Sequence, residues 1–218
     1  MVVATINAAG GVMPLLIVSK QQRVQAVWLG GGGPPGALYA ATDSFFMQGL
    51  MFLNFITSFH EHIVDTGKND GKPHILLFDG HASHVTFEVI ELAKSLNFEL
   101  FQLPSHSSHI AQPLDAAAFE IVKREVTSVL RAFGHHCDGK MPVKADIVAV
   151  IRDASERSFT PSQITASFGR AGLWPWTWLG PLIGYVAVAP IERVARAIGH
   201  LWRICGSHKR ARACCFSR

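Results

Sequence analysis

The sequence contains little cysteine, and its cysteines are badly placed for a disulfide framework. Only four occur in 218 residues, and three of them lie within the last 14. They are Cys137, Cys205, Cys214 and Cys215. This distribution favours a reducing compartment. The amino terminus, MVVATINAAGG, also lacks a basic region followed by an adequate apolar stretch, so we expect no secretory signal.

An excess of positive charge is missing from most of the chain. Residues 1–190 contain 13 Lys/Arg and 15 Asp/Glu, whereas residues 191–218 contain 7 and 1. The formal net charge of +4 therefore comes from the end of the chain and does not by itself indicate nucleic-acid binding. The hydrophobic content of 49% excludes disorder throughout and predicts one sizeable domain with a real core.

Only one stretch invites comparison with a membrane segment. Residues 173–189, LWPWTWLGPLIGYVAVA, form a run of 17 residues without a charge. The run contains two prolines and two glycines, and a spanning helix needs about 20 apolar residues. We therefore expect buried or interfacial structure here and no membrane as a partner.

Apolar periodicity and turn residues predict the order of the elements. Residues 2–19 are typical of a hairpin around Ala8–Gly11, and residues 43–63 have helical spacing. HILLFD (74–79) predicts a strand buried on both faces. A helix over 85–97 and a strand over 98–104 then complete a βαβ unit with parallel strands. Further helices are predicted from Asp115 onward and over 144–157.

Two aspartates follow the paired strands of this unit. Asp79 ends the first strand, in FDGHASH, and Asp115 opens the helix after the second. Ligands of such sheets gather at the carboxyl ends of strands, and neighbouring carboxylates repel unless a cation or proton intervenes. Hard oxygen ligands suit Mg²⁺ or Mn²⁺, which serve phosphodiester chemistry. The simpler interpretation is that Asp79 caps a turn and Asp115 N-caps a helix.

The residues around both aspartates follow two longer motifs. The first reads Asp-Gly-His-x-Ser-His and the second Leu-Pro-x-His-x-x-His-x-x-Gln-Pro-Leu-Asp. The matching positions are Asp79, Gly80, His81, Ser83, His84, Leu103, Pro104, His106, His109, Gln112, Pro113, Leu114 and Asp115. With VVATINAAGGVMPLLIVSK and ITASFGRAGLWPW, residues 1–176 resemble the DDE superfamily endonucleases, most closely the pogo, Tigger and jerky type of mariner-like transposases.

The resemblance implies a fold, a chemistry and a location. The fold is α/β, an RNase H-like mixed sheet flanked by helices. Asp79 and Asp115 are implied to be catalytic metal ligands, the second and third of three carboxylates. His81, His84, His109 and Gln112 are implied to support them. The expected cofactor is Mg²⁺ or Mn²⁺, the expected partner is DNA, and the expected location is the nucleus.

One departure from the family pattern limits the expected activity. In the family the first carboxylate lies on a central strand upstream of the hairpin, and this chain begins at the hairpin. Asp43, Asp65 and Asp70 lie on a helix cap or a polar turn, so we do not expect them to replace it. We therefore predict an incomplete domain over 1–176 with its first strand missing. The sheet should expose backbone groups there, and cleavage should be weak or lost.

Two other interpretations remain open. The pairs His81/His84 and His106/His109, to which His135, His136 and Cys137 add further candidates, have ligand types that zinc prefers. A non-catalytic DNA- or protein-binding module is the second, and homo-oligomer formation is compatible with both. Residues 177–218 form an apolar and then basic tail that matches nothing in the family, and basic runs of this kind are commonly solvated.

Overall fold

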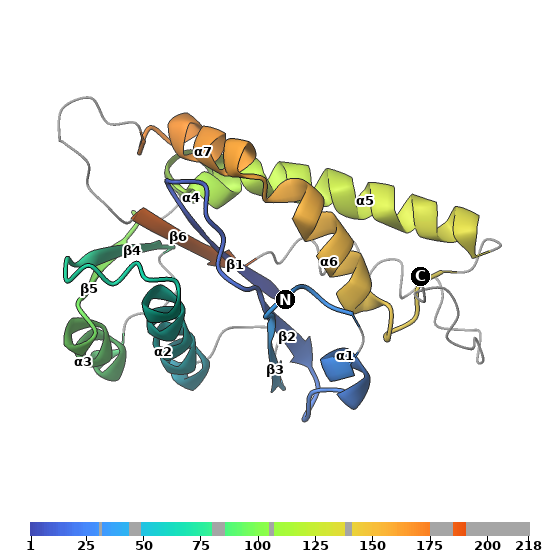
Figure 1. The fold of residues 1–218 in the computed structure, drawn as a ribbon, viewed down its shortest axis with the longest axis horizontal. Helices are drawn as coiled ribbons and strands as arrows, with labels where there is room; N and C mark the ends of the chain where they lie inside the picture. The colour runs from blue at the N-terminus through green and yellow to red at the C-terminus, as the bar shows by residue number, and fades with distance from the viewer. Residues whose placement is uncertain are drawn as a thin grey trace.

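The computed structural model describes residues 1–30, 32–43, 49–79, 86–104, 107–137 and 141–174, and the backbone of 185–190. These residues form a six-stranded mixed sheet with helices on both faces (Figure 1). The strands are β1 (Val2–Asn7), β2 (Leu16–Lys20), β3 (Leu38–Thr42), β4 (His74–Phe78), β5 (Phe98–Gln102) and β6 (Tyr185–Pro190). The helices are α1 (Ala26–Gly30), α2 (Gly49–Asp65), α3 (Phe87–Ser95), α4 (Ser108–Ala111), the π-helical turn η2 (Leu114–Ala118), α5 (Phe119–His136), α6 (Ile147–Ser158) and α7 (Pro161–Arg170). The predicted α/β class with a mixed sheet is confirmed.

The predicted hairpin is present as the antiparallel pair β1 and β2. Its turn is held by Asn7, whose Oδ1 accepts hydrogen bonds from the backbone N–H of Ala9 at 3.1 Å and of Gly11 at 2.8 Å. Gly10 has φ +88°, a conformation that glycine adopts without strain. A Cβ at this position would lie 2.9 Å from the Cβ of Pro161, the first residue of α7. The hairpin tip is therefore seated on α7 without room for a side chain.

Replacing Gly10 with alanine is expected to destabilise the protein by about 2–4 kcal/mol. The left-handed backbone costs about 1–2 kcal/mol for a residue with a Cβ, and the contact with Pro161 adds an overpacking cost of about 1–3 kcal/mol. Urea unfolding measures the change. Gly67→Ala is the matched control, because Gly67 has φ +66° and a Cβ there meets no atom within 4 Å. Equal losses in the two variants would show that the hairpin tip does not bear on α7.

The predicted βαβ unit is confirmed as β4, α3 and β5. Strands β4 and β5 are parallel, with His74 opposite Phe98 and Phe78 opposite Gln102. The N-cap of helix α3 is Thr86, whose side chain accepts a hydrogen bond from the N–H of Val89. It ends before Asn97, which has φ +61° and turns the chain into β5. The helix predicted over 43–63 is α2, which runs from Gly49 to Asp65.

Strand β6 occupies the centre of the sheet, whose order is β3-β2-β1-β6-β4-β5. It pairs antiparallel with β1, from Val3–Pro190 to Asn7–Val186. On its other edge it pairs parallel with β4, from Ile75–Tyr185 to Phe78–Val188. The expectation of exposed backbone groups at this position is therefore wrong. No described strand precedes β1, but a strand from the end of the chain fills the central place.

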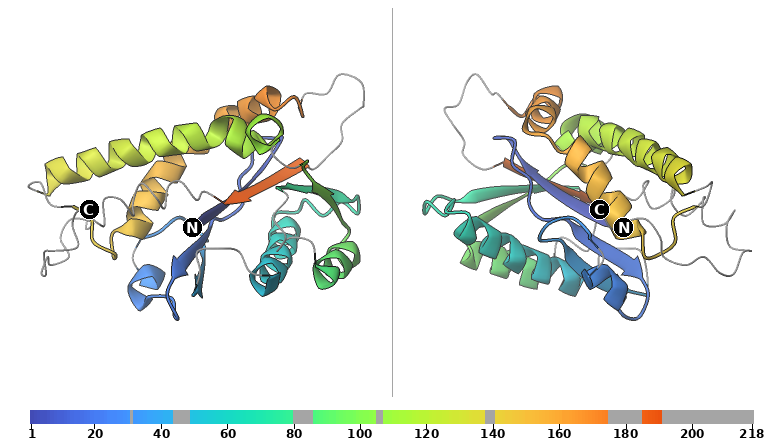
Figure 2. Two further views of the ribbon diagram at one scale, coloured as in Figure 1. Left: turned by 180° about the vertical axis from the view of Figure 1, so that it is seen from behind. Right: turned by 45° about the vertical axis from the view of Figure 1, so that its right-hand side comes forward.

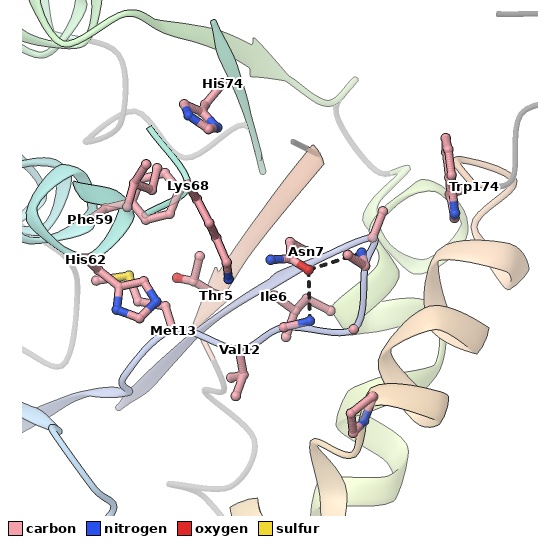
Figure 3. Close-up of a pocket in the computed structure, with 16 residues that line it drawn as sticks. Thr5, Ile6, Asn7, Val12, Met13, Phe59, His62, Lys68, His74 and Trp174 are labelled. Carbon is pink, nitrogen blue, oxygen red and sulfur yellow. Dashed lines mark hydrogen bonds between the residues drawn. The ribbon is translucent and has the colours of Figure 1, made fainter. Parts of the chain in front are cut away.

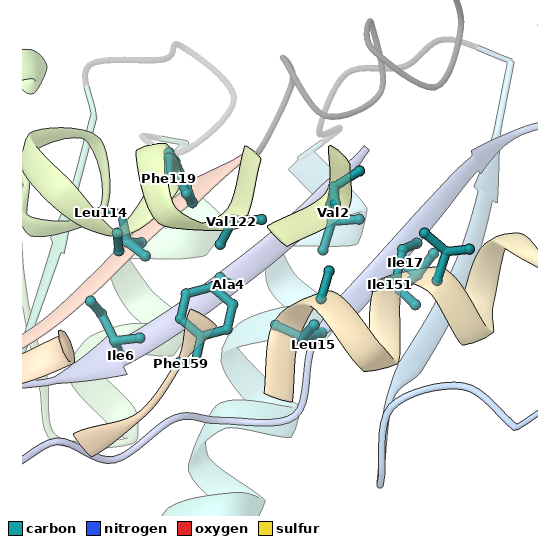
Figure 4. Packing of buried hydrophobic residues seen from close by; sticks show 14 of the residues in the cluster. Val2, Ala4, Ile6, Leu15, Ile17, Leu114, Phe119, Val122, Ile151 and Phe159 are labelled. Atoms are coloured by element: carbon teal, nitrogen blue, oxygen red, sulfur yellow. The ribbon is translucent and has the colours of Figure 1, made fainter. Parts of the chain in front are cut away.

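Two apolar layers hold the helices to the sheet. One layer joins β1 and β2 to η2, α5, α6 and α7, and includes Ala4, Ile6 and Leu114 (Figure 4). The other joins β1, β2, β4 and β5 to α2 and α3, and includes Phe52 and Phe78. The views in Figure 2 show α5, α6 and α7 on one side of the sheet and α2 and α3 on the other. Because β4 is covered on both faces, it needs the unalternated apolar sequence from which it was predicted.

Candidate functional site

Asp79 directly follows the last residue of β4 and is half-buried. The carbonyl of Phe78 accepts a hydrogen bond from the N–H of Leu103 at 2.9 Å, so the chain after β5 stays attached to β4 up to this edge. Phe78 faces α2 and α3. Because successive residues of an extended chain alternate between the two faces, Asp79 belongs to the opposite face, the one on which η2, α5, α6 and α7 lie.

Asp115 lies in the first turn of η2, immediately before α5, and is exposed. The N-cap position of η2 belongs to Pro113 and has no side-chain cap hydrogen bond, so the interpretation of Asp115 as an N-cap is wrong. A carboxylate in a first helical turn still interacts favourably with the helix dipole. Its neighbour Leu114 is fully buried in the layer that contains Ile6. The buried Leu114 side chain holds η2 against the sheet, whereas Asp115 stays exposed at the edge of this apolar layer.

The topology brings the two aspartates to one side of the sheet. Turn η2 contacts β6, and β6 is hydrogen-bonded to β4, the strand that ends at Asp79. Together Asp79 and Asp115 supply two hard oxygen donors. Mg²⁺ commonly binds through one or two carboxylates and keeps several waters for exchange with phosphate oxygens. The donor set therefore fits a hard divalent ion that is held loosely.

The predicted supporting residues divide into described and undescribed groups. Gln112 follows α4 and is fully buried, whereas His109 lies on α4 and is exposed. His81, His84 and His106 lie outside the described residues. Within the described ranges, no three His, Cys, Asp or Glu side chains gather as metal ligands would. The zinc interpretation therefore stays a prediction.

The three aspartates considered as replacements lie away from this edge. Asp70 pairs with Lys72 at 3.3 Å in the loop before β4, at the opposite end of that strand from Asp79. Asp65 is the last residue of α2, and Asp43 follows β3, an outer strand. Strand β4 lies between β5 and β6. Of these, β6 occupies the centre of the sheet, and its sequence YVAVAP contains no acidic residue. The resemblance places the first of three carboxylates on a central strand, and the central strand β6 has none.

Comparison with known proteins identifies the family. The family described as DDE superfamily endonuclease matches residues 1–168. The chain belongs to the DDE superfamily endonucleases. The resemblance seen in the motifs around Asp79 and Asp115 is thereby confirmed at the level of the family, whose members generally use divalent metal ions and act on nucleic acids. No solved structure matches the chain. Strand β6 lies outside the residues that the DDE family matches.

A curated relative carries a different kind of name. A protein of Cochliobolus lunatus called MFS-type transporter clz9 is 31% identical over 170 residues. The match covers 78% of this chain and 18% of that protein, so the chain spans less than a fifth of its length. Within the described part of this DDE chain, no helix has the length and apolar character needed to cross a membrane.

Two strands were missed by sequence reasoning. Strand β3 pairs parallel with β2 and follows the glycine-rich loop, and β6 was included in an apolar tail. The available signal for β6 was local: residues 185–190 alternate valine with alanine after a tyrosine, and valine and tyrosine favour strands. Its pairing partners on β4 and β1 lie at least 110 residues away in the chain and leave no trace in that local pattern.

Proposed function

We propose that this chain is a transposase-derived DDE endonuclease domain that binds DNA and a divalent ion, Mg²⁺ or Mn²⁺, through Asp79 and Asp115. The observation that supports this most is the placement of both aspartates beside the central strand pair, Asp79 after β4 and Asp115 on η2 against β6. In such a site a bound ion makes water or a hydroxyl a better nucleophile and stabilises the leaving oxygen of the phosphodiester.

The residues of this chain have two tasks in that chemistry. The backbone of β4 is hydrogen-bonded to strands on both edges, so the backbone before Asp79 is rigid. The buried Leu114 holds η2 against the sheet and thereby positions Asp115. A site of two carboxylates attracts a cation less strongly than a site of three. We therefore propose that the ion binds weakly and that strand cleavage is impaired relative to intact members of the family.

The proposal is tested by exchanging each aspartate for asparagine. Asp79→Asn and Asp115→Asn should each lower Mn²⁺ affinity by at least about tenfold, because each removes a charged ligand and keeps its shape. Isothermal titration with Mn²⁺ measures the affinity, and nicking of supercoiled plasmid in Mn²⁺ measures the activity, which both variants should abolish. Asp65→Asn is the matched control, since Asp65 is exposed at the end of α2.

The possible results separate the alternatives. Unchanged Mn²⁺ binding in both site variants would contradict the proposed ligands. Mn²⁺ binding that depends on Asp79 and Asp115 without any nicking would instead assign the chain to the non-catalytic DNA-binding class. Stoichiometric zinc in protein purified without added metal would favour the histidine site. The control variant should behave as the original protein in each assay.

A further inference from the structure

A cavity of about 690 Å³ lies at the end of the sheet where β1 ends and β4 begins. The end of β1, the turn over 8–13 and the end of α2 line it, and Lys68 and His74 border it from the loop before β4 and from the first residue of β4 (Figure 3). Because Asp79 follows the other end of β4, the cavity is separate from the proposed metal site. Its volume is within the range of about 300–1,000 Å³ that small-molecule sites have.

The charge of this cavity is one-sided. Among the described residues that line it, the ionisable ones are Lys68, His62 and His74, and none is acidic. Figure 3 shows the side chain of Lys68 extending from its loop toward Thr5 on β1. No ion pair joins Lys68 to any residue in the described ranges. The lysine therefore brings an uncompensated positive charge to a largely apolar wall.

The two imidazoles add hydrogen-bonding groups rather than charge. Burial, with Lys68 nearby, lowers the pKa of His62, and burial also lowers the pKa of His74. Both are then neutral at pH 7, and each keeps one donor and one acceptor nitrogen. His74 is 9% exposed, and its Nε2 is buried without a hydrogen-bond partner in the described part of the chain. Leaving such an atom unsatisfied costs about 1–3 kcal/mol.

We propose that this cavity binds a small organic anion with an apolar body. Its anionic group pairs with the Lys68 ammonium, and its apolar body lies against the side chains of Met13, Phe59 and Ile63, which belong to one apolar layer. The chemistry follows from the described residues of the lining, which combine a lysine without an ion-pair partner among them, two neutral imidazoles and a predominantly apolar surface. A neutral ligand would gain nothing from the exposed ammonium of Lys68, and a multiply charged ligand would meet too few cations among the described lining residues.

The test uses two related dyes and the full chain. 1-Anilinonaphthalene-8-sulfonate carries a sulfonate, whereas N-phenyl-1-naphthylamine has the same aromatic body without the charge. Fluorescence titration of Lys68→Gln should show sulfonate binding weakened by about tenfold, the value of one charge-assisted contact. Binding of the neutral dye should not change. Lys68→Arg should retain the affinity, because it keeps the charge.

Lys72→Gln is the matched control, because Lys72 is exposed, pairs with Asp70 and does not line the cavity. Equal effects of Lys68→Gln and Lys72→Gln would overturn the proposal, as would equal loss of both dyes. Thermal melting of each variant identifies any loss of folding, and Lys68→Arg then decides the role of the charge. Displacement of the sulfonate dye by a single-stranded oligonucleotide would assign the cavity to nucleic acid and overturn the small-molecule proposal.

Discussion

Replacing Ala189 with aspartate is expected to raise Mn²⁺ affinity by about a hundredfold and to raise Mn²⁺-dependent plasmid nicking with it. One added carboxylate close to a bound cation contributes a few kcal/mol at a protein border, and about 2.8 kcal/mol corresponds to a hundredfold in affinity. This prediction rests on the proposed metal site. It makes β6, a strand without an acidic residue, supply the carboxylate that the family carries on its central strand.

The strand register selects the position. Phe78 pairs with Val188, so the next residues along the two parallel strands are Asp79 and Ala189. On the other edge, position 189 pairs with Ala4, which belongs to the apolar layer shared with η2. Cross-strand partners share a face of the sheet. An aspartate at 189 is therefore expected on the face of Asp79 and Asp115, level with Asp79.

Stability provides a second readout for this variant. Without metal, the added carboxylate repels its neighbours, so Ala189→Asp should unfold at lower urea concentration than the original protein. A metal concentration 100-fold above the dissociation constant stabilises a protein by about 2.7 kcal/mol, so Mn²⁺ should reverse the loss. Ala189→Asn is the matched control and should gain neither affinity nor nicking. Identical metal binding by the aspartate and asparagine variants would contradict the role given to β6.

Replacing Ala187 with proline is expected to lower the free energy of unfolding by at least about 3 kcal/mol. Ala187 pairs with Ile6 of β1 on one edge and with Leu77 of β4 on the other. Proline has no N–H and its ring obstructs the neighbouring strand, so it is excluded from central strands. Both apolar layers depend on the sheet that β6 joins, because β1 and β4 do not pair with each other directly.

Urea unfolding followed by circular dichroism measures this change. Ala187→Gly is the control, because it keeps the N–H and should cost only about 0.5–1 kcal/mol. A proline variant as stable as the glycine variant would show that β6 does not hold β1 and β4 together. The result also concerns the proposed metal site. Strand β6 pairs with β4 and is contacted by η2, so its loss would remove the link between the elements that carry Asp79 and Asp115.

Local sequence predicted those elements whose signals lie within a few residues. The hairpin of β1 and β2, the unit of β4, α3 and β5, and helices α2, α5 and α6 all have their own apolar period and end residues, such as Asn97 after α3. Strands β3 and β6 were not predicted: β3 follows a glycine-rich loop and pairs with β2, and β6 pairs with β1 and β4, which lie far away in the chain. Short apolar segments become strands when a sheet offers them an unpaired edge.

The two aspartates of the candidate site were predictable because their signals are also local, whereas their placement relative to the sheet was not. Asp79 begins one motif and Asp115 ends the other, and a βαβ unit has a known handedness that brings their elements to one edge. The side to which Asp115 belongs depends on Leu114, whose burial against Ile6 could not be inferred from the motif alone. The anion cavity had no sequence signal, because it is formed where the hairpin, the end of α2 and the start of β4 meet.

The sequence by itself determined the family, the two aspartates and most of the helices, because these depend on side-chain order within short segments. Only the tertiary structure decided that the sheet has a central strand. Six residues near the end of the chain provide it, because backbone hydrogen bonding is indifferent to where in the chain a strand comes from. A metal-binding carboxylate requires an acidic residue at one particular position, whereas a strand requires only a backbone that can pair with its neighbours. This difference explains how β6 can be the central strand of the sheet and contribute no acidic residue.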